Sequence, residues 1–214
     1  MSEILAQMAT AIIQGKKEDT GRLAQEAIDS GISAEDVLYK GLMPGMDHVS
    51  VEFKAARMFV PEVMRSARAM LNAMEILKPI MAETGVRMVG KVLLGTVKGD
   101  LHDIGKNLVG MMCEGAGFEI EDIGTDVPPE AFVDAVKTFE PDVVGMSALL
   151  TTTMRVMGDV IKALEEAGVR DQLKIMVGGA PVSQAFADQI GADAYAPDAA
   201  AAASKAAELV GKSG

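Results

Sequence analysis

The sequence has little of several features that define common protein classes. It contains one cysteine and no tryptophan in 214 residues, and 20 Lys and Arg are outnumbered by 31 Asp and Glu. A single cysteine excludes an internal disulfide framework and a metal cluster held by cysteines alone. The net charge of −11 argues against nucleic acid or an anionic membrane as a main partner, because both require a basic surface.

Long apolar runs are absent as well. No stretch reaches the roughly 18 apolar residues that cross a bilayer. Residues 1–17 include Glu3 and lack the basic start of a secretory signal, so we expect a cytoplasmic protein. What the chain does have is 49% hydrophobic residues. This is enough for a sizeable core, in one domain of upper size or in two small ones.

Residues 1–86 are predicted to form a four-helix bundle. In the last helix, apolar residues recur at alternating steps of four and three and give one apolar face: Val63, Ala67, Met70, Met74, Leu77 and Met81. Ser33 with Asp36 three residues later predicts a helix start. Pro44 predicts a break or kink in the third helical segment, and Pro79 a kink or an early end of the last one.

Residues 87–214 change to short apolar runs that alternate with helical patterns. The expected strands are residues 89–95, 118–123, 142–147, 173–177 and 192–195. The expected helices are residues 104–114, 129–139, 154–167, 181–189 and 199–210. Strands alternating with helices predict βαβ units and a parallel sheet. We therefore expect an α/β domain with a five-stranded, flavodoxin-like (Rossmann-like) sheet, joined to the bundle by a linker at residues 83–87.

Ligands of such sheets bind beyond the carboxyl ends of the strands, where the strand order switches. The first loop there reads T-V-K-G-D-L-H-D-I-G from Thr96 to Gly105. In it, Asp100 lies two residues before His102. An acceptor that fixes one imidazole nitrogen leaves the other for a metal ion. Gly105 permits a large ligand to approach the backbone closely.

Two further loops at the same edge contain hydroxyl groups and glycines: Ser147 with Thr151–Thr153, and Gly178 with Gly179. Each feature also has a purely structural interpretation. Asp100 and His102 form an ordinary surface or capping pair in many loops, three hydroxyls can cap the next helix, and paired glycines can form a tight turn. Their coincidence at one end of the predicted sheet favours a binding site.

Together these loops resemble a known family. D-L-H-D-I-G at 100–105, S-A-L at 147–149 and G-G at 178–179 resemble the D-x-H-x-x-G, S-x-L and G-G motifs of cobalamin-binding domains. The intervening stretches, residues 106–146 and 150–177, are similar in length to those of the family. F-V-P-E-V-M-R-S-A-R-A-M at 59–70 resembles the helical cap of cobalamin-dependent methionine synthase and of the corrinoid proteins of methylotrophic methyltransferase systems.

The resemblance implies a cobalamin or related cobamide that cycles between methyl-Co(III) and Co(I). It implies base-off binding, with His102 as the lower axial ligand of the metal, Asp100 as its hydrogen-bond partner and Thr153 as the hydroxyl that continues the relay. It places the nucleotide tail of the cofactor along Ser147, Leu149, Thr151, Gly178, Gly179 and Ala199. It implies further cofactor contacts at Gly99, Leu101, Asp103, Ile104 and Gly105.

The same resemblance implies that the helical half covers the upper face of the corrin. Phe53 and Val60 match the aromatic and the aliphatic residue of that cover. Seven residues apart, they lie two turns along one helical face if the helix continues between them. Core packing is the alternative interpretation of both side chains.

For function, the resemblance implies a methyl carrier of one-carbon metabolism, such as methanogenesis or acetogenesis, that is not catalytic alone. Its partners would be a substrate-specific methyltransferase, a second methyltransferase acting on coenzyme M or tetrahydrofolate, and a reductive activase. Chain length favours a methylated amine as the substrate. Two alternatives stay open: a subunit of a cobalamin-dependent mutase, which normally lacks the cap, and a cobalamin-based sensor, which usually carries a DNA-binding or output domain.

Overall fold

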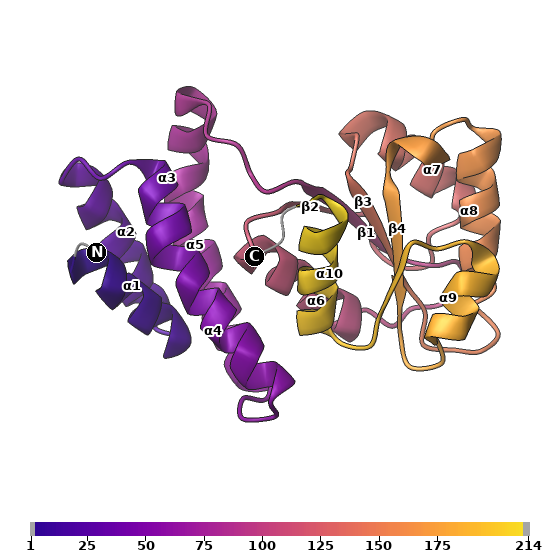
Figure 1. Cartoon of the computed structure of the whole chain (residues 1–214), viewed down its shortest axis with the longest axis horizontal. Coiled ribbons are helices and arrows are strands. Elements are labelled where there is room, and N and C mark those ends of the chain that lie inside the picture. Colours follow the sequence, from indigo (N-terminus) through magenta and orange to yellow (C-terminus); the bar gives the residue numbers. More distant parts are fainter. Residues whose placement is uncertain (1–2, 212–214) are drawn as a thin grey trace. The chain divides into compact units, whose positions relative to one another are not determined.

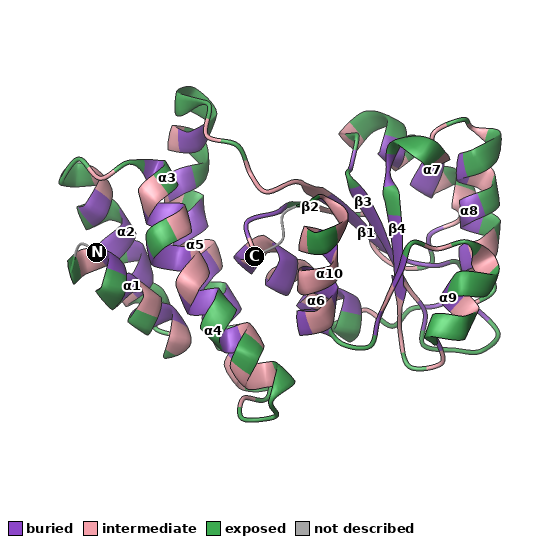
Figure 2. Ribbon diagram, viewed as in Figure 1, coloured by how far each residue is buried: buried purple, intermediate pink, exposed green. Residues whose placement is uncertain are grey.

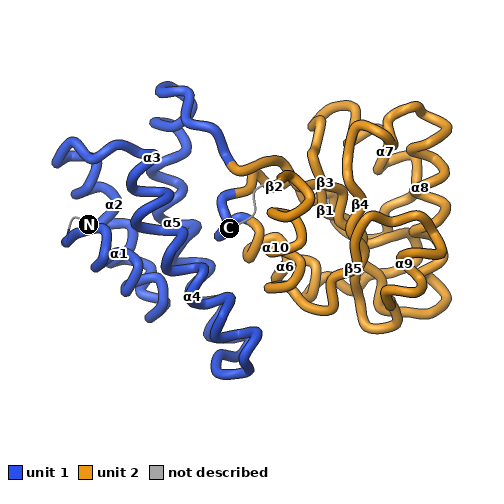
Figure 3. Tube along the Cα trace, in the orientation of Figure 1, with its two compact units in different colours: residues 1–88, 114–117 blue, residues 89–113, 118–214 orange. Residues whose placement is uncertain are grey.

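The computed structural model describes residues 3–211 and divides the chain into two compact units (Figures 1 and 3). Unit 1 is Met1–Met88 with Glu114–Gly117, and unit 2 is Val89–Cys113 with Phe118–Gly214. Among the described residues, no helix combines the length and the apolar character that crossing a membrane requires.

The helices of unit 1 are α1 (Glu3–Ile13), α2 (Lys17–Asp29), α3 (Ala34–Asp36), the π-helical η1 (Val37–Leu42), α4 (Met43–Lys54) and α5 (Val60–Thr84). Because α3, η1 and α4 follow one another without a gap, the unit has four helical segments, as predicted. The apolar stripe of α5 is confirmed, since all six of its residues are buried (Figure 2). Helix α5 packs mainly on α2.

The prolines of unit 1 lie inside helical stretches. The predicted cap at Ser33 is confirmed, because its Oγ accepts a hydrogen bond from the Asp36 amide at 3.1 Å. The chain stays helical through Pro44, and the register changes there instead: the Met43 amide donates to the Leu38 carbonyl, five residues back. Pro79 does not end α5, which continues to Thr84 and stops at Gly85 in a left-handed conformation (φ 71°).

The helix does not continue from Phe53 to Val60. Helix α4 ends at Lys54, and α5 begins at Val60 as a separate helix. The Glu62 carboxylate accepts a hydrogen bond from the Phe59 amide at 2.9 Å. It thereby satisfies one of the amides that a helix start leaves without an intrahelical partner. The condition under which both residues would lie on one face of a single helix is therefore not met.

Unit 2 alternates strands and helices, as the sequence predicts. Its elements are β1 (Lys91–Thr96), α6 (Ile104–Gly115), β2 (Glu119–Asp122), α7 (Pro129–Phe139), β3 (Val143–Ser147), α8 (Val156–Glu166), the 3-10 turn η2 (Arg170–Gln172), β4 (Lys174–Gly178), α9 (Gln184–Ile190), β5 (Ala194–Ala196) and α10 (Ala199–Leu209). All strands are parallel, in the order β2-β1-β3-β4-β5. This is the flavodoxin-like order, so the predicted fold class is confirmed.

The sheet is covered on both faces, and successive strand residues point to opposite sides. Leu93 belongs to the apolar core with residues of α7, α8 and α9. Its neighbour Leu94 faces α6, where a Cβ added at Gly110 would lie 3.3 Å from the Leu94 side chain. Strand order switches between β1 and β3, so the carboxyl ends of these two strands define the expected site.

In unit 2, two helix starts differ from prediction: α8 begins at Val156 and not at residue 154, and the start after β4 differs by three residues. The helix after β4 begins at Gln184 and not at Pro181, because the Ser183 hydroxyl accepts a hydrogen bond from the Phe186 amide at 3.3 Å and caps the helix there. The residues before it form a turn in which the Val182 amide donates to the Gly179 carbonyl at 2.9 Å.

Candidate functional site

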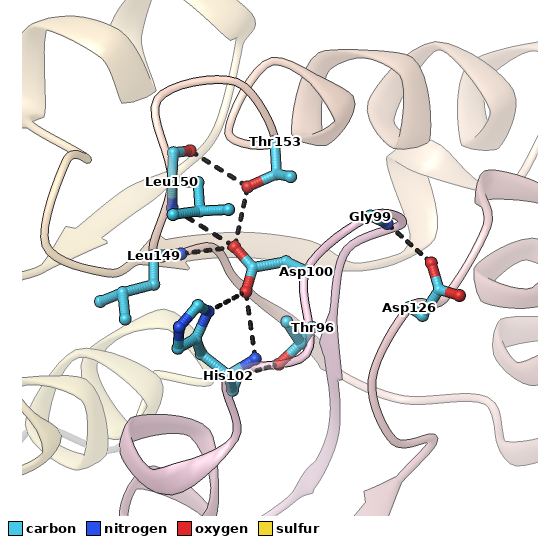
Figure 4. Close-up of polar contacts among 8 residues, drawn as sticks. All are labelled: Thr96, Gly99, Asp100, His102, Asp126, Leu149, Leu150 and Thr153. Carbon is cyan, nitrogen blue, oxygen red and sulfur yellow. Dashed lines mark hydrogen bonds and ion pairs between the residues drawn. The ribbon is translucent and has the colours of Figure 1, made fainter.

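The loop after β1 lies at the switch point and is held by hydrogen bonds along its length (Figure 4). Gly99 adopts a left-handed conformation (φ 85°), which favours glycine. The Asp100 amide donates to the Val97 carbonyl at 3.1 Å. At the end of the loop, the buried Thr96 hydroxyl donates to the His102 carbonyl at 2.9 Å. The backbone on either side of Asp100 is therefore fixed.

Asp100 is fully buried, and both of its carboxylate oxygens accept hydrogen bonds (Figure 4). Oδ1 contacts His102 Nδ1 at 2.6 Å and accepts from the His102 amide at 3.1 Å. Oδ2 accepts from the Leu149 amide at 2.8 Å, the Leu150 amide at 3.3 Å and the Thr153 hydroxyl at 2.8 Å. The loop after β3 thus supplies three donors to a residue of the loop after β1.

These donors determine the charge of Asp100. Burial raises the pKa of its carboxyl group, but the hydrogen bonds from the Leu149 amide, the His102 ring, the Thr153 hydroxyl and the His102 amide outweigh burial and hold the pKa well below its usual value. An ionised carboxylate only accepts hydrogen bonds, so Nδ1 of His102 must carry a proton. In the neutral imidazole, Nε2 then presents its lone pair.

The His102 side chain is 52% exposed, and Nε2 makes no hydrogen bond within residues 3–211. In Figure 4 this nitrogen points away from Asp100. An imidazole with one nitrogen bound to a carboxylate and the other free is the arrangement of a metal-binding histidine. The loops after β1 and β3 also expose four large apolar side chains: Leu101, Ile104, Leu149 and Leu150. Exposed apolar groups in one place mark binding surfaces.

Gly105 adds to this fit, because a Cβ built there would meet nothing within 4 Å. Space therefore lies beside the first turn of α6, as expected from the sequence. The free imidazole nitrogen suits a metal ion, the exposed leucines suit apolar groups of a ligand, and the open backbone at Gly105 leaves room for a large one. On these observations the residues present fit a corrinoid.

The paired glycines have a packing role in this structure. Gly179 has φ 124°, and a Cβ there would lie 1.8 Å from the Ala148 carbonyl oxygen. At Gly178 a Cβ would lie 2.9 Å from the Ala196 carbonyl oxygen. The loops after β3, β4 and β5 approach one another so closely that a side chain has no room at these positions.

Other predicted residues lie outside the network around Asp100. Thr151 is exposed and makes no hydrogen bond to Asp100, and Ser147 is half-buried at the end of β3. Ala199 is the buried first residue of α10, where the Asp198 carboxylate caps the helix by accepting from the Ala201 amide at 2.7 Å. The main-chain carbonyl of Asp103, just before α6, accepts a hydrogen bond from the main-chain amide of Asn107 at 2.7 Å.

Phe53 and Val60, the two residues expected to cover the corrin face, belong to unit 1. The Phe53 side chain is half-buried near the end of α4, whereas Val60 is 37% exposed at the start of α5.

The expected site residues leave out three that hold the His102 loop: Thr96 at its start, Asp126 and Leu150. Thr96 ends a strand, and Leu150 contributes only its main chain. Asp126 lies in the loop after β2, three residues beyond the predicted strand at 118–123. Its acidic side chain at the carboxyl edge of the sheet is the available signal.

A doubly wound sheet that presents an immobilised imidazole at its switch point, among exposed apolar side chains, defines a module for a large metal-containing cofactor. Comparison with known proteins supports this class. Two family models described as B12 binding domain match residues 90–204 and 4–78. The chain belongs to the corrinoid proteins, the cobalamin-binding proteins of methyltransferase systems.

Individual relatives match over nearly the whole chain. Dimethylamine corrinoid protein 1 of Methanosarcina acetivorans is 44% identical, over 97% of this chain and 98% of the relative. The dimethylamine corrinoid protein of Methanosarcina barkeri is 45% identical, also over 97% and 98%. A chain of the methanol:cobalamin methyltransferase complex of Methanosarcina barkeri superposes with a TM-score of 0.85 at 33% identity, over 98% of this chain and 81% of that one.

Proposed function

We propose that this protein carries a methyl group from a methylated amine, with dimethylamine as the first candidate, between two methyltransferases. One observation supports this most directly: the His102 ring is fixed through Nδ1 by an ionised, buried carboxylate and leaves Nε2 free at the surface. Relatives of matching length are named for dimethylamine, and the structural neighbour belongs to a methyltransferase complex.

When bound, the corrinoid supplies a cobalt ion that takes up the methyl group and gives it away. The residues of this chain hold and orient that cofactor. His102 would ligate the cobalt ion through Nε2, Asp100 sets the tautomer of its ring, and Thr153 holds Asp100. Because the Thr153 hydroxyl also lies 3.0 Å from the Leu150 carbonyl, it can donate to either oxygen and so adjust how strongly Asp100 binds the ring.

The remaining assignments follow the family pattern. Residues 87–214 form the cobalamin-binding domain and residues 1–86 the helical cap. Phe53 and Val60 would cover the upper face of the corrin and exclude water. The nucleotide tail would contact Ser147, Leu149, Thr151, Gly178, Gly179 and Ala199. The other loop contacts would be Gly99, Leu101, Asp103, Ile104 and Gly105.

The partners in this proposal are separate enzymes. A methyltransferase specific for the methylated amine would load the carrier, and a second one, acting on coenzyme M or tetrahydrofolate, would unload it. A reductive activase would reduce carrier that has become oxidised, so that it can accept methyl groups again. The structural neighbour from a methyltransferase complex supports the first of these partners.

The test uses the two histidines of the chain as a matched pair. The apoprotein is incubated with hydroxocobalamin, desalted and reduced to the Co(II) form, and its electron paramagnetic resonance spectrum is recorded. The protein is prepared with ¹⁵N-labelled and with unlabelled histidine, because the lower base of the cofactor also carries a nitrogen that can split the cobalt lines. We expect the label to change the splitting in the wild type and in His48→Ala, whose residue lies exposed on α4. In His102→Ala the label should have no effect. A colourless wild-type protein, or a wild-type spectrum that the label does not change, would contradict the proposal.

Methyl carriage needs its own measurement. The reconstituted protein is incubated with radiolabelled dimethylamine and a cell extract of its source organism. Label should appear on the wild type and not on the cofactor-free protein. Labelling from methanol but not from dimethylamine would keep the carrier role and refute the substrate.

A further inference from the structure

Asp126 contacts the loop that bears His102 through both its main chain and its side chain. Figure 4 shows the side-chain contact with Gly99. It lies between β2 and α7. Its Oδ1 accepts a hydrogen bond from the Gly99 amide at 2.7 Å, and its own amide donates to the Asp100 carbonyl at 3.0 Å. One residue therefore binds both ends of the segment Gly99–Asp100.

The backbone of Asp126 is in the left-handed region. Its φ is 56°, a value that aspartate and asparagine adopt more readily than other residues with a Cβ. Asp126 is exposed, so burial of its side chain does not hold it there. The bridge between Val97 and Val127 and the two hydrogen bonds to the His102 loop keep it in place.

These contacts complete the support of the His102 segment. The loop after β3 binds only the carboxylate of Asp100, whereas Asp126 binds the main chain that carries it. Loss of the Asp126 carboxylate would let the Gly99 peptide turn, and the direction of the Asp100 side chain would change with it. Since Asp100 orients the ring of His102, Nε2 would be held less firmly in one position.

We propose that Asp126 is a positioning residue: it fixes the segment from Gly99 to His102 and, through Asp100, the direction in which His102 presents Nε2. The part concerning a bound cobalt rests on the proposed function. The part concerning the loop stands on the contacts alone.

The decisive variant is Asp126→Gly, because glycine accepts the left-handed conformation and keeps the amide but lacks the carboxylate. Asp126→Asn is the conservative variant, since asparagine tolerates the same conformation and its amide oxygen can accept from Gly99. The matched control is Glu140→Gly. Glu140 is also exposed and left-handed (φ 52°), but it caps α7 at the amino-terminal edge of the sheet.

Two readouts separate the loop from the cofactor. In the apoprotein, amide hydrogen exchange at Gly99 and His102 should be on the order of 5-fold faster in Asp126→Gly, the change expected for one exposed hydrogen bond. In the Co(II) holoprotein, a smaller share of the signal should show nitrogen splitting that changes on ¹⁵N labelling of histidine, and cobalamin should bind about 5-fold more weakly. Asp126→Asn should recover most of both effects, and Glu140→Gly should match the wild type.

Unchanged exchange and unchanged splitting in Asp126→Gly would overturn the proposal. Faster exchange with wild-type splitting would also overturn it, because Asp126 would then be a structural contact without influence on His102. A wild-type spectrum that ¹⁵N labelling of histidine does not change would refute the proposed function instead. In that case the exchange at Gly99 and His102 would still decide whether Asp126 fixes the loop.

Discussion

The hydroxyl of Thr153 offers a test of the network around Asp100 by the smallest possible change. Thr153→Val keeps the shape of the side chain and removes the one side-chain donor that the loop after β3 gives to Asp100, a buried contact of 2.8 Å. Hydrogen bonds to charged groups contribute about 1.5–3 kcal/mol. Asp100 keeps its two amide donors from that loop. We therefore expect a loss near the lower end, about 2 kcal/mol, or roughly 30-fold in the folding equilibrium.

The assay is urea unfolding of the apoprotein at pH 7, followed by circular dichroism. The neighbouring variant Thr152→Val is the control, because Thr152 is exposed and its hydroxyl makes no hydrogen bond within residues 3–211. Thr153→Ser, which restores the hydroxyl, should recover most of the lost free energy. If Thr153→Val unfolds at the same urea concentration as Thr152→Val, the hydroxyl contributes nothing to holding Asp100, and the reasoning is refuted.

Four other outcomes are expected. Gly179→Ala should destabilise the protein by more than about 3 kcal/mol in urea, since a Cβ there meets backbone, whereas Gly124→Ala, with open space around it, should cost about 1 kcal/mol. Cys113, whose thiol pKa is raised by burial to about 12, should resist a disulfide reagent at pH 8 until urea unfolds the chain. The pKa of Asp100 is lower in the folded state than in the unfolded state, so the unfolded state takes up its proton first as pH falls. Below about pH 4 the free energy of unfolding should then drop by up to about 1.4 kcal/mol per pH unit, a slope that Asp100→Asn should lack. Phe53→Ala should speed the loss of the bound methyl group in light or oxygen, and equal rates would leave Phe53 a packing residue.

Periodicity and local spacing account for what the sequence predicts well. The stripe from Val63 to Met81 repeats at helical spacing, so it predicts α5 without knowledge of the partner helices. The contact between Asp100 and His102 also follows from a separation of two residues. Proline effects are less local: Pro79 stays inside α5 because packing of the buried face outweighs one lost hydrogen bond.

Contacts between loops of different strands are harder to derive. Asp126 reaches the Gly99 amide across 27 residues of sequence, and Leu150 reaches Asp100 across 50. In both contacts the donor is a main-chain amide, which nearly every residue has, so the sequence does not show which amide each carboxylate binds. For the glycines at 178 and 179 the sequence allows a tight turn or part of a binding site, and the structure shows a close approach of main chains at both. Sequence alone indicates that glycine is needed, but not what lies against it.

The position of His102 depends on how β1 and β3 are paired more than on the loop sequence itself. In the parallel register Thr96 pairs with Ser147, so Asp100 and Leu149 both lie just beyond the ends of neighbouring strands. A shift of one residue would move Leu149 by about 3.3 Å along the strand direction, farther than a hydrogen bond of 2.8 Å tolerates. Asp100 would then be buried without its three donors from the loop after β3, and its ionised form would lose much of its support. The same contacts that orient His102 therefore also stabilise the correct register of the sheet, and a variant that weakens one is expected to weaken the other.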